Sequence, residues 1–347
     1  MSDPILVWGA GAIGGTIGAF LARAGHEVHF VDLVEDHVRA IEQSGLQIDG
    51  PVDAFSVRCH AMLPGEVKGR YGRIFLAVKA QHTARALDGL MPHLADDGYV
   101  LSCQNGMNEP QIAAVAGDRR TMGAFVNFGA DWQEPGRISF GGRGAVVVGE
   151  LDGALTSRAV DLHNALKDFE PNAVLTDNIY GYLWSKLAWA TVLKAEGITQ
   201  ETIVGFLAEP RLRPLIRWLI RSVLAISLAE GVRPMPFQSF DPAAFLTGND
   251  ADADACIEAI IASRTGSTKL YSGVWRDIMV RRRPTEVPYQ LGPVAEIGRR
   301  HGLPVATIAA LIDRVRAVEA GAPADGIDQA LALAETAAQE MAQVMSR

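Results

Sequence analysis

A glycine-rich segment early in the chain has the spacing of a phosphate-binding loop. It comprises Gly9-Ala10-Gly11-Ala12-Ile13-Gly14, follows an apolar run over residues 5–8 and leads into a stretch of helical character over residues 13–24. In a G-x-G-x-x-G segment between strand and helix, the first glycine permits a tight turn and the second lets the backbone approach a pyrophosphate. The third lets helix and strand pack closely, while helix N-terminal amides face the phosphates. We therefore expect these six residues to bind a dinucleotide.

An acidic residue further along the chain indicates which dinucleotide is used. Asp32 ends the next apolar run, close to the separation of about 20 residues expected for the carboxylate that binds the adenine ribose hydroxyls. A carboxylate there accepts hydrogen bonds from a free 2′,3′-diol and repels a 2′-phosphate. NAD is therefore the expected cofactor. NADP stays open because Arg39, a helical turn or two later, could reach a phosphate, although a solvated helix face is the simpler interpretation of Arg39.

Short strands alternate with helices around these residues. Expected strands cover residues 5–8, 27–31, 73–78 and 99–103, and expected helices cover residues 13–24, 37–43 and 83–91. This alternation predicts a parallel sheet with crossover helices. Over residues 121–149 the sequence becomes β-rich. The runs 124–128 and 145–148, separated by Pro135-Gly136 and Gly141-Gly142, are expected to complete the sheet as hairpin strands.

The second half of the chain carries helical signals instead. Helical length and periodicity are found over residues 183–195, 212–230, 253–262, 294–301, 305–318 and 330–345. This change predicts an α/β protein of two domains. We expect a dinucleotide-binding domain over residues 1–177 and a mainly α-helical domain, which holds the substrate, over residues 178–347.

Composition and charge exclude several functional classes. The chain has 347 residues, of which 48% are hydrophobic and 21% charged, the balance of a globular enzyme. Its net charge of -8 opposes contact with phosphates, so no nucleic-acid partner is expected. The basic run Arg281-Arg282-Arg283 is interpreted as a solvated helix end or loop.

Cysteine usage and the first apolar stretch bear on location. Cys59, Cys103 and Cys256 lack the spacing of a zinc or redox motif, so we expect no metal site and interpret them as buried apolar residues in a reducing compartment. The stretch over residues 5–20 could be mistaken for a signal peptide. However, Asp3 stands where a basic region belongs, and glycines interrupt the run. We expect a cytoplasmic protein that does not bind membranes.

Six short segments, in a specific order and spacing, carry a family resemblance. They are residues 9–15, Val78-Lys79-Ala80, Gln104-Asn105-Gly106, Trp184-Ser185-Lys186-Leu187, Thr285-Glu286-Val287 and His301-Gly302-Leu303-Pro304. Through them the chain resembles, over almost its whole length, the ketopantoate reductases (2-dehydropantoate 2-reductases). The resemblance implies a Rossmann domain joined to a helical domain of the 6-phosphogluconate-dehydrogenase type, and a homodimer. It also implies NAD(P)-dependent hydride transfer between nicotinamide and a small carbonyl or hydroxyl substrate.

The resemblance further implies roles for single residues. Lys186 corresponds to the family's catalytic acid, since a positioned ammonium stabilises the alkoxide formed on hydride transfer and donates its proton. Asn105 would lie beside nicotinamide and substrate; the alternative is an αL turn residue before Gly106. Lys79 corresponds to a lysine that faces the cofactor. Glu286 corresponds to an acidic residue that binds substrate hydroxyls, the alternative being a surface carboxylate.

Departures from the family pattern fall on the substrate side. The asparagines usual one and two turns after Lys186 are replaced by Ala190 and Lys194, and the family's E-x-D element reads Glu286-Val287-Pro288. The family serine aligns only loosely with Ser272. Lys194 could bind a substrate anion or act as a second acid. We therefore expect the reaction class to be kept and the substrate to differ from ketopantoate, with Glu286, Lys194 and Ser272 binding it.

Other functions stay open at this point. The chain could be an authentic 2-dehydropantoate 2-reductase, an opine or imine dehydrogenase, or a cofactor-binding redox sensor without turnover. Lys186 together with Asn105 argues against the sensor. Because fold alone does not determine function, an activity screen over alcohols and 2-oxo acids is the measurement that separates these classes.

Overall fold

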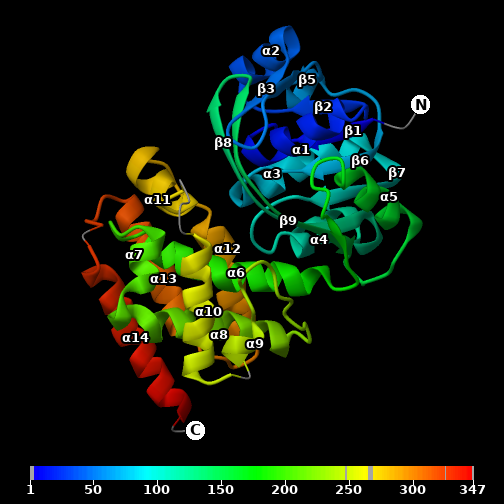
Figure 1. Ribbon diagram of the computed structural model, residues 1–347. Coiled ribbons are helices and arrows are strands. Elements are labelled where there is room, and N and C mark those ends of the chain that lie inside the picture. The colour runs from blue at the N-terminus through cyan, green and yellow to red at the C-terminus, as the bar shows by residue number, and fades with distance from the viewer. Residues whose placement is uncertain (1–3, 247, 265–268, 325, 346–347) are drawn as a thin grey trace. The chain divides into compact units, whose positions relative to one another are not determined.

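The computed structural model describes residues 4–246, 248–264, 269–324 and 326–345 (Figure 1). The chain divides into two compact units, unit 1 over Met1–Ile179 and unit 2 over Tyr180–Arg347. Unit 1 contains strands and helices, and unit 2 is helical, which confirms the fold class predicted from the sequence. Asp3, used above in the argument against a targeting segment, lies outside the described residues.

Unit 1 is built on one mixed sheet. Within the described residues, ten strands pair in the order β4-β3-β9-β8-β7-β6-β1-β2-β5, with β10 on β9. β7, β6, β1 and β2 are mutually parallel, whereas β8 and β9 are antiparallel. The strands are β1 (Ile5–Trp8), β2 (Val28–Val31), β3 (Leu46–Asp49), β4 (Phe55–Val57), β5 (His60–Met62), β6 (Tyr71–Leu76), β7 (Leu94–Ser102), β8 (Thr121–Glu134), β9 (Arg137–Glu150) and β10 (Val174–Leu175).

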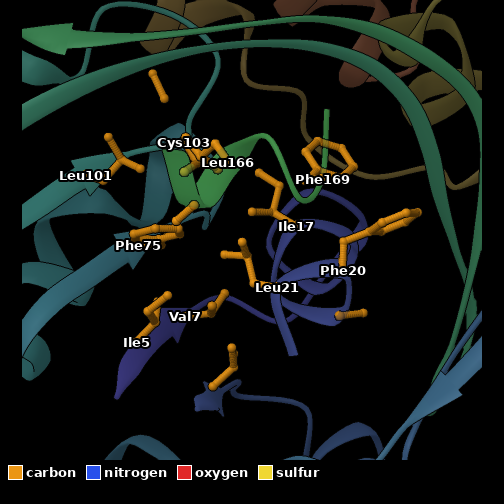
Figure 2. Packing of buried hydrophobic residues seen from close by; sticks show 14 of the residues in the cluster. Ile5, Val7, Ile17, Phe20, Leu21, Phe75, Leu101, Cys103, Leu166 and Phe169 are labelled. Atoms are coloured by element: carbon orange, nitrogen blue, oxygen red, sulfur yellow. The ribbon is translucent and has the colours of Figure 1, made fainter. Parts of the chain in front are cut away.

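Helices of unit 1 pack on this sheet through apolar side chains. They are α1 (Ala12–Arg23), α2 (Glu35–Ser44), α3 (Thr83–Leu90), α4 (Glu109–Ala116) and α5 (Ser157–Leu166). Figure 2 shows Ile17, Phe20 and Leu21 of α1 in the core, and all three are buried. Phe20 meets Phe169 edge to face, with ring centroids 5.2 Å apart. Each such side chain contributes about 1.5–3 kcal/mol when buried, so this core holds α1 in the interior of unit 1.

The long hairpin of β8 and β9 corrects one prediction. The turn at Pro135-Gly136 is confirmed, with Gly136 at φ 76°. The expectation that Gly141-Gly142 separates two strands is wrong, because both residues lie inside β9. Gly142 pairs with Gly129 where the register shifts. An irregularity of this kind bends a strand pair without ending it, and glycine tolerates the bend.

In the described part of unit 2 the regular secondary structure is helical, apart from an isolated bridge between Phe237 and Phe240. Its helices are α6 (Ile179–Glu196), α7 (Ile203–Ala208), α8 (Arg213–Ala229), α9 (Ala243–Leu246), α10 (Asp250–Ser263), α11 (Gly273–Trp275), α12 (Val287–Arg300), α13 (Ala306–Glu319) and α14 (Asp328–Met345). α12 starts two turns earlier than expected. Pro288 and Pro293 disguised these turns in the sequence. Pro288 lies in the first turn, where proline is well tolerated, whereas Pro293 lies inside the helix.

A buried carboxylate fixes the packing of three helices in unit 2. Glu340 of α14 accepts hydrogen bonds from the Thr307 hydroxyl at 2.7 Å and from Trp218 Nε1 at 2.9 Å. It also accepts the Ala306 N–H, so it caps the start of α13 while binding α8. In the described ranges, no helix is both long and apolar enough to cross a membrane.

Candidate functional site

The predicted cofactor residues of unit 1 gather at one edge of the sheet. Trp8 at the end of β1 pairs with Val31 of β2 and Leu76 of β6, and Leu76 pairs with Ser102 of β7. The carboxyl ends of four adjacent parallel strands are therefore level. The residues that follow these ends are the glycine-rich loop, Asp32, Lys79 and Asn105. This edge is where open α/β sheets bind their ligands.

Each glycine of the loop has a distinct geometric reason. Gly9 has φ 105°, and a Cβ there would lie 2.9 Å from the backbone of Ala77, in the loop after β6. A Cβ on Gly14 would lie 2.1 Å from the Gly9 carbonyl oxygen, so only glycine lets α1 pack this closely on β1. A Cβ on Gly11 would meet no atom within 4 Å. Gly11 therefore faces open space at the N-terminus of α1, where backbone amides are available to an anion.

Asp32 is fixed on the same loop. Its Oδ2 accepts the Ala10 N–H at 2.9 Å, and its Oδ1 accepts the Val34 N–H at 3.0 Å. A carboxylate offers about four acceptor positions, so two remain for ribose hydroxyls. Arg39 forms an ion pair with Glu35 one turn away on the exposed face of α2. That pairing agrees with the simpler interpretation of Arg39.

His37 is a residue of this site that the sequence reasoning missed. It lies on α2 and is only 1% exposed. Its Nε2 lies 2.8 Å from the Ala10 carbonyl oxygen, and its Nδ1 accepts the Gly136 N–H at 2.9 Å. One histidine thus joins the glycine-rich loop to the β8–β9 turn. The periodicity of α2 gave only its helical position, and no motif marks the contact.

Gln104 holds the loop that carries Lys79. The Gln104 side chain is buried and donates from Nε2 to the Val78 carbonyl and to the Thr83 hydroxyl, both at 2.8 Å. Lys79 itself is half-buried and precedes the short helix η2 (Ala80–His82). This explains the glutamine of the Q-N-G element as a support for the neighbouring loop.

Asn105 is exposed at the carboxyl end of β7, and its carbonyl accepts a hydrogen bond from Asn108 Nδ2 at 2.9 Å. The alternative of an αL turn residue at Asn105 is wrong. The positive φ, 99°, falls on Gly106, which adopts this conformation without steric cost. Asn105 is therefore an exposed polar residue just after β7, and Gly106 makes the turn.

In unit 2, helix α6 carries three of the residues singled out from the sequence. Lys186, Ala190 and Lys194 follow one another at intervals of four residues and so share a helix face. Lys186 and Ala190 are half-buried, and Lys194 is buried. Side chains on a helix lean towards its N-terminus, and Lys194 Nζ lies 3.4 Å from the Ala190 carbonyl oxygen. The Lys194 ammonium therefore lies alongside Ala190.

Lys194 is a buried cation with little direct compensation. Burial lowers the pKa of its ammonium from 10.5 to about 8, and the negative charge of Glu286 opposes that shift. Glu286 is half-buried at the start of α12. The adjacent Thr285 fixes its backbone, because Thr285 N–H donates to Glu319 at 2.7 Å and the Thr285 hydroxyl accepts the Val287 N–H at 3.2 Å. Glu286 is thus an electrostatic neighbour of Lys194.

Ser272 lies near the C-terminal end of α6, through Glu196. The Ser272 N–H donates to Glu196 Oε1 at 3.4 Å, and the Ser272 hydroxyl accepts the Trp275 N–H at 3.0 Å. Burial raises the pKa of the Glu196 carboxyl from 4.5 to about 7, while hydrogen bonds from Ser272 oppose the shift. Sequence reasoning missed Glu196, because an acidic residue at a helix end is usually solvated. The C-terminal end of α6 therefore carries two separate pairs, Lys194 with Glu286 and Glu196 with Ser272.

Other expectations concern cysteines and charge. Cys103 and Cys256 are buried, and Cys59 is half-buried. Burial raises the pKa of the Cys59 thiol to about 11, which makes this thiol a poor nucleophile at neutral pH. Arg281 and Arg283 are exposed at the end of a short helix and both pair with Asp277, in agreement with the interpretation of the basic run. Among the described residues, no group of histidine, cysteine and acidic side chains could hold a metal ion.

Two family profiles match the two halves of the chain. The first, "Ketopantoate reductase PanE/ApbA", matches residues 5–153, and the second, "Ketopantoate reductase PanE/ApbA C terminal", matches residues 178–319. With the dinucleotide loop at the sheet edge, these matches define an NAD(P)-dependent oxidoreductase that acts on C=O or CH–OH groups. The chain belongs to the ketopantoate reductase family, which confirms the resemblance seen in the sequence.

Curated relatives cover nearly the whole chain at low identity. A 2-dehydropantoate 2-reductase of Mesorhizobium japonicum is 28% identical over 344 residues, which is 91% of this chain and 98% of the relative. A 2-dehydropantoate 2-reductase of Pyrococcus horikoshii is 24% identical over 298 residues, 85% of this chain and 90% of the relative.

Solved structures share the fold. D-mandelate dehydrogenase with NADH and anilino(oxo)acetate superposes with a TM-score of 0.79 at 21% identity, covering 91% of this chain and 98% of that one. A PanE/ApbA family ketopantoate reductase from Ralstonia eutropha JMP134 gives a TM-score of 0.77 at 26% identity, with the same coverage. At these identities the substrate does not transfer from one chain to the other.

Proposed function

We propose that this protein is an NADH-dependent oxidoreductase that reduces a small anionic carbonyl compound other than ketopantoate, with Lys186 as proton donor. One observation carries the proposal. The face of α6 presents a half-buried lysine, then an alanine, then a buried lysine beside Glu286. Lys186 preserves the family's proton donor, which supports the same reaction class. Ala190 and Lys194 replace two family asparagines, which changes the substrate that this face can bind.

The cofactor assignment is supported by unit 1. The Asp32 carboxylate is fixed by backbone amides with acceptor capacity left for a 2′,3′-diol, and its charge disfavours a 2′-phosphate. Gly11 leaves room for the pyrophosphate, while Lys79 and Asn105 follow the neighbouring strands. When bound, NADH supplies the hydride. We propose that the glycine-rich loop and Asp32 bind the adenine half, and that Lys79 and Asn105 contact the cofactor beyond it.

The proposed chemical step uses the Lys186 ammonium. As hydride reaches the carbonyl carbon, the C=O electron pair moves to oxygen, and Lys186 stabilises that charge and gives up a proton to form the hydroxyl. Lys186 is left as a neutral amine and regains its proton from water. Half-burial suits this role, because part of the Lys186 residue remains open to the water that would return the proton.

The substrate side is where this chain differs from its family. A buried ammonium destabilises the protein unless a negative group approaches it. Glu286 acts on the Lys194 ammonium through its electric field. We propose that a substrate anion completes the neutralisation of Lys194, with Glu286 binding a hydroxyl. Ser272, engaged by Trp275 and Glu196, would hold the end of α6 in place.

The substrate is first identified by a screen of NADH oxidation over 2-oxo acids, ketopantoate included, with and without amines. Two substitutions on α6 then test which lysine is the proton donor. Lys186→Ala should lower kcat by about 10²–10⁴-fold, as expected on removal of a general acid, and leave the Kd of NADH unchanged. Lys194→Ala, the matched control on the same face, should raise KM more than it lowers kcat. The reverse pattern would make Lys194 the acid. In the substrate screen, a preference for ketopantoate would show an authentic 2-dehydropantoate 2-reductase. Turnover only in the presence of an amine would show an imine reductase.

Location and assembly stay predictions. The homodimer is supported by a fold neighbour, described as dimeric ketopantoate reductase from Staphylococcus aureus, that superposes with a TM-score of 0.68 at 16% identity. The cytoplasmic location rests on the sequence argument alone.

A further inference from the structure

His37 stands out among the buried polar groups that the proposed chemistry does not use. It projects from α2 into the interior of unit 1 and contacts two segments far apart in the sequence. Nε2 meets the Ala10 carbonyl oxygen at 2.8 Å, and Nδ1 receives the Gly136 N–H at 2.9 Å. Trp132 Nε1 makes a longer contact to the same Nδ1 at 3.4 Å. Both ring nitrogens are therefore engaged.

These partners determine the protonation state of the ring. A backbone N–H can only donate, so Nδ1 must be an unprotonated acceptor. A carbonyl oxygen can only accept, so Nε2 must carry the proton and donate it to Ala10. His37 is accordingly a neutral imidazole in the Nε2–H tautomer, and neither the other tautomer nor the imidazolium satisfies both partners.

The contact to Ala10 determines how the next peptide is oriented. A trans peptide is planar, and its C=O and N–H point in opposite directions, so fixing the Ala10 carbonyl also fixes the Gly11 N–H. The Ala10 N–H is fixed in turn by Asp32 at 2.9 Å. Asp32 and His37 thus anchor two consecutive peptide planes, and the second carries the amide of the glycine that faces open space.

We propose that His37 is a positioning residue for cofactor binding, which holds the Gly11 amide ready for the pyrophosphate through the Ala10 carbonyl. The β8–β9 turn sets the tautomer that makes this possible. Gly136 is itself held on β3, because its carbonyl accepts the Gln47 N–H at 2.8 Å. Preorganised donors bind more tightly, because the ligand does not have to order them.

Two amide substitutions separate the two contacts of the ring. In His37→Gln the side-chain amide can place an N–H where Nε2 lies, which keeps the donor to Ala10 and loses the acceptor for Gly136. In His37→Asn the amide oxygen can lie where Nδ1 lies, which keeps the acceptor and loses the donor. Each variant loses one buried hydrogen bond, so their melting temperatures should fall together.

The affinity for NADH should nevertheless differ between the two variants. We expect the Kd of NADH, and that of ADP-ribose as a probe without nicotinamide, to rise roughly three- to tenfold in His37→Asn and less than twofold in His37→Gln. Equal Kd values in the two folded variants, or a larger loss in His37→Gln, would show that the ring serves stability alone and would overturn the proposal.

The tautomer can be measured without any substitution. ¹⁵N NMR of the histidine-labelled wild-type protein should show His37 neutral, with the proton on Nε2, at pH 7. A proton on Nδ1 would refute the proposal even if neither variant folds. Neither the Kd values nor the tautomer of His37 depends on turnover, so both measurements stay informative if the proposed reaction at Lys186 is wrong.

Discussion

Replacement of Lys194 by methionine should make the protein more stable at neutral pH. The two side chains have similar length. Methionine removes the charge of Lys194, a residue that is only 3% exposed. Burial lowers the pKa of this ammonium from 10.5 to about 8. At about 1.4 kcal/mol per tenfold change, the difference corresponds to a cost on the order of 3 kcal/mol for keeping the buried group charged. The variant should recover much of that cost.

The dependence of this effect on pH has a definite sign. Below pH 8, Lys194 is charged in both the folded and the unfolded protein, so the whole cost is present. Between pH 8 and 10.5 the folded protein loses its proton first, so the unfolded state binds more protons and wild-type stability rises with pH. The advantage of Lys194→Met should therefore be largest at pH 7. It should shrink by about 2 kcal/mol by pH 9.5.

Urea unfolding of both proteins at pH 7 and pH 9.5 measures this directly. Lys186→Met is the matched control on the same face of α6. Its lysine is half-buried, so its unfolding free energy at pH 7 should change by about 0.5–1 kcal/mol at most. If Lys194→Met is less stable than the wild type at pH 7, or its advantage does not shrink with pH, then Lys194 is well compensated in the folded protein. The argument for a substrate anion would then fail.

Two further predictions concern the cofactor side. Gly11→Val should abolish measurable NADH binding in a fluorescence titration, while far-UV circular dichroism and the melting temperature stay near wild type. The reason is that the new side chain enters open space and meets only the ligand. Undiminished binding would mean that the pyrophosphate lies elsewhere. Asp32→Asn should narrow the preference for NADH over NADPH by about tenfold or more, since hydrogen bonds to a charged group contribute about 1.5–3 kcal/mol, and an unchanged ratio of the two Kd values would remove Asp32 from the adenine ribose.

The gathering of the candidate cofactor residues at one sheet edge was predictable because its determinants are local in sequence. The glycine-rich loop needs only a strand, a tight turn and a helix start, and Asp32 directly follows the very next strand. Lys79 and Asn105 follow the ends of later parallel strands, and the carboxyl ends of such strands meet at one edge. Strand alternation therefore places these residues together without knowledge of side-chain contacts.

The contacts that support the site could not be predicted in this way. His37 reaches Gly136, and Gln104 reaches Val78, through hydrogen bonds that depend on how distant segments pack. β4 and β5, of three residues each, are too short to give a periodic signal, yet β4 completes the edge of the sheet that holds β3. Such features depend on tertiary context, which one sequence does not reveal.

The two lysines of α6 show why sequence resemblance transfers chemistry better than specificity. Lys186 matches the family motif and is half-buried. Its proposed role as proton donor requires only an ammonium group that can reach the substrate. Lys194 has no counterpart in the family pattern, and the sequence alone leaves it as either an anion-binding residue or a second acid. Burial, the field of Glu286 and the neighbouring Ala190 favour anion binding. With a pKa of about 8, Lys194 is largely protonated at neutral pH and can pair with an anion at little further cost. If Lys194 contacts the substrate as proposed, a substrate that lacks a negative group would leave that charge uncompensated. We therefore expect discrimination against neutral carbonyl compounds.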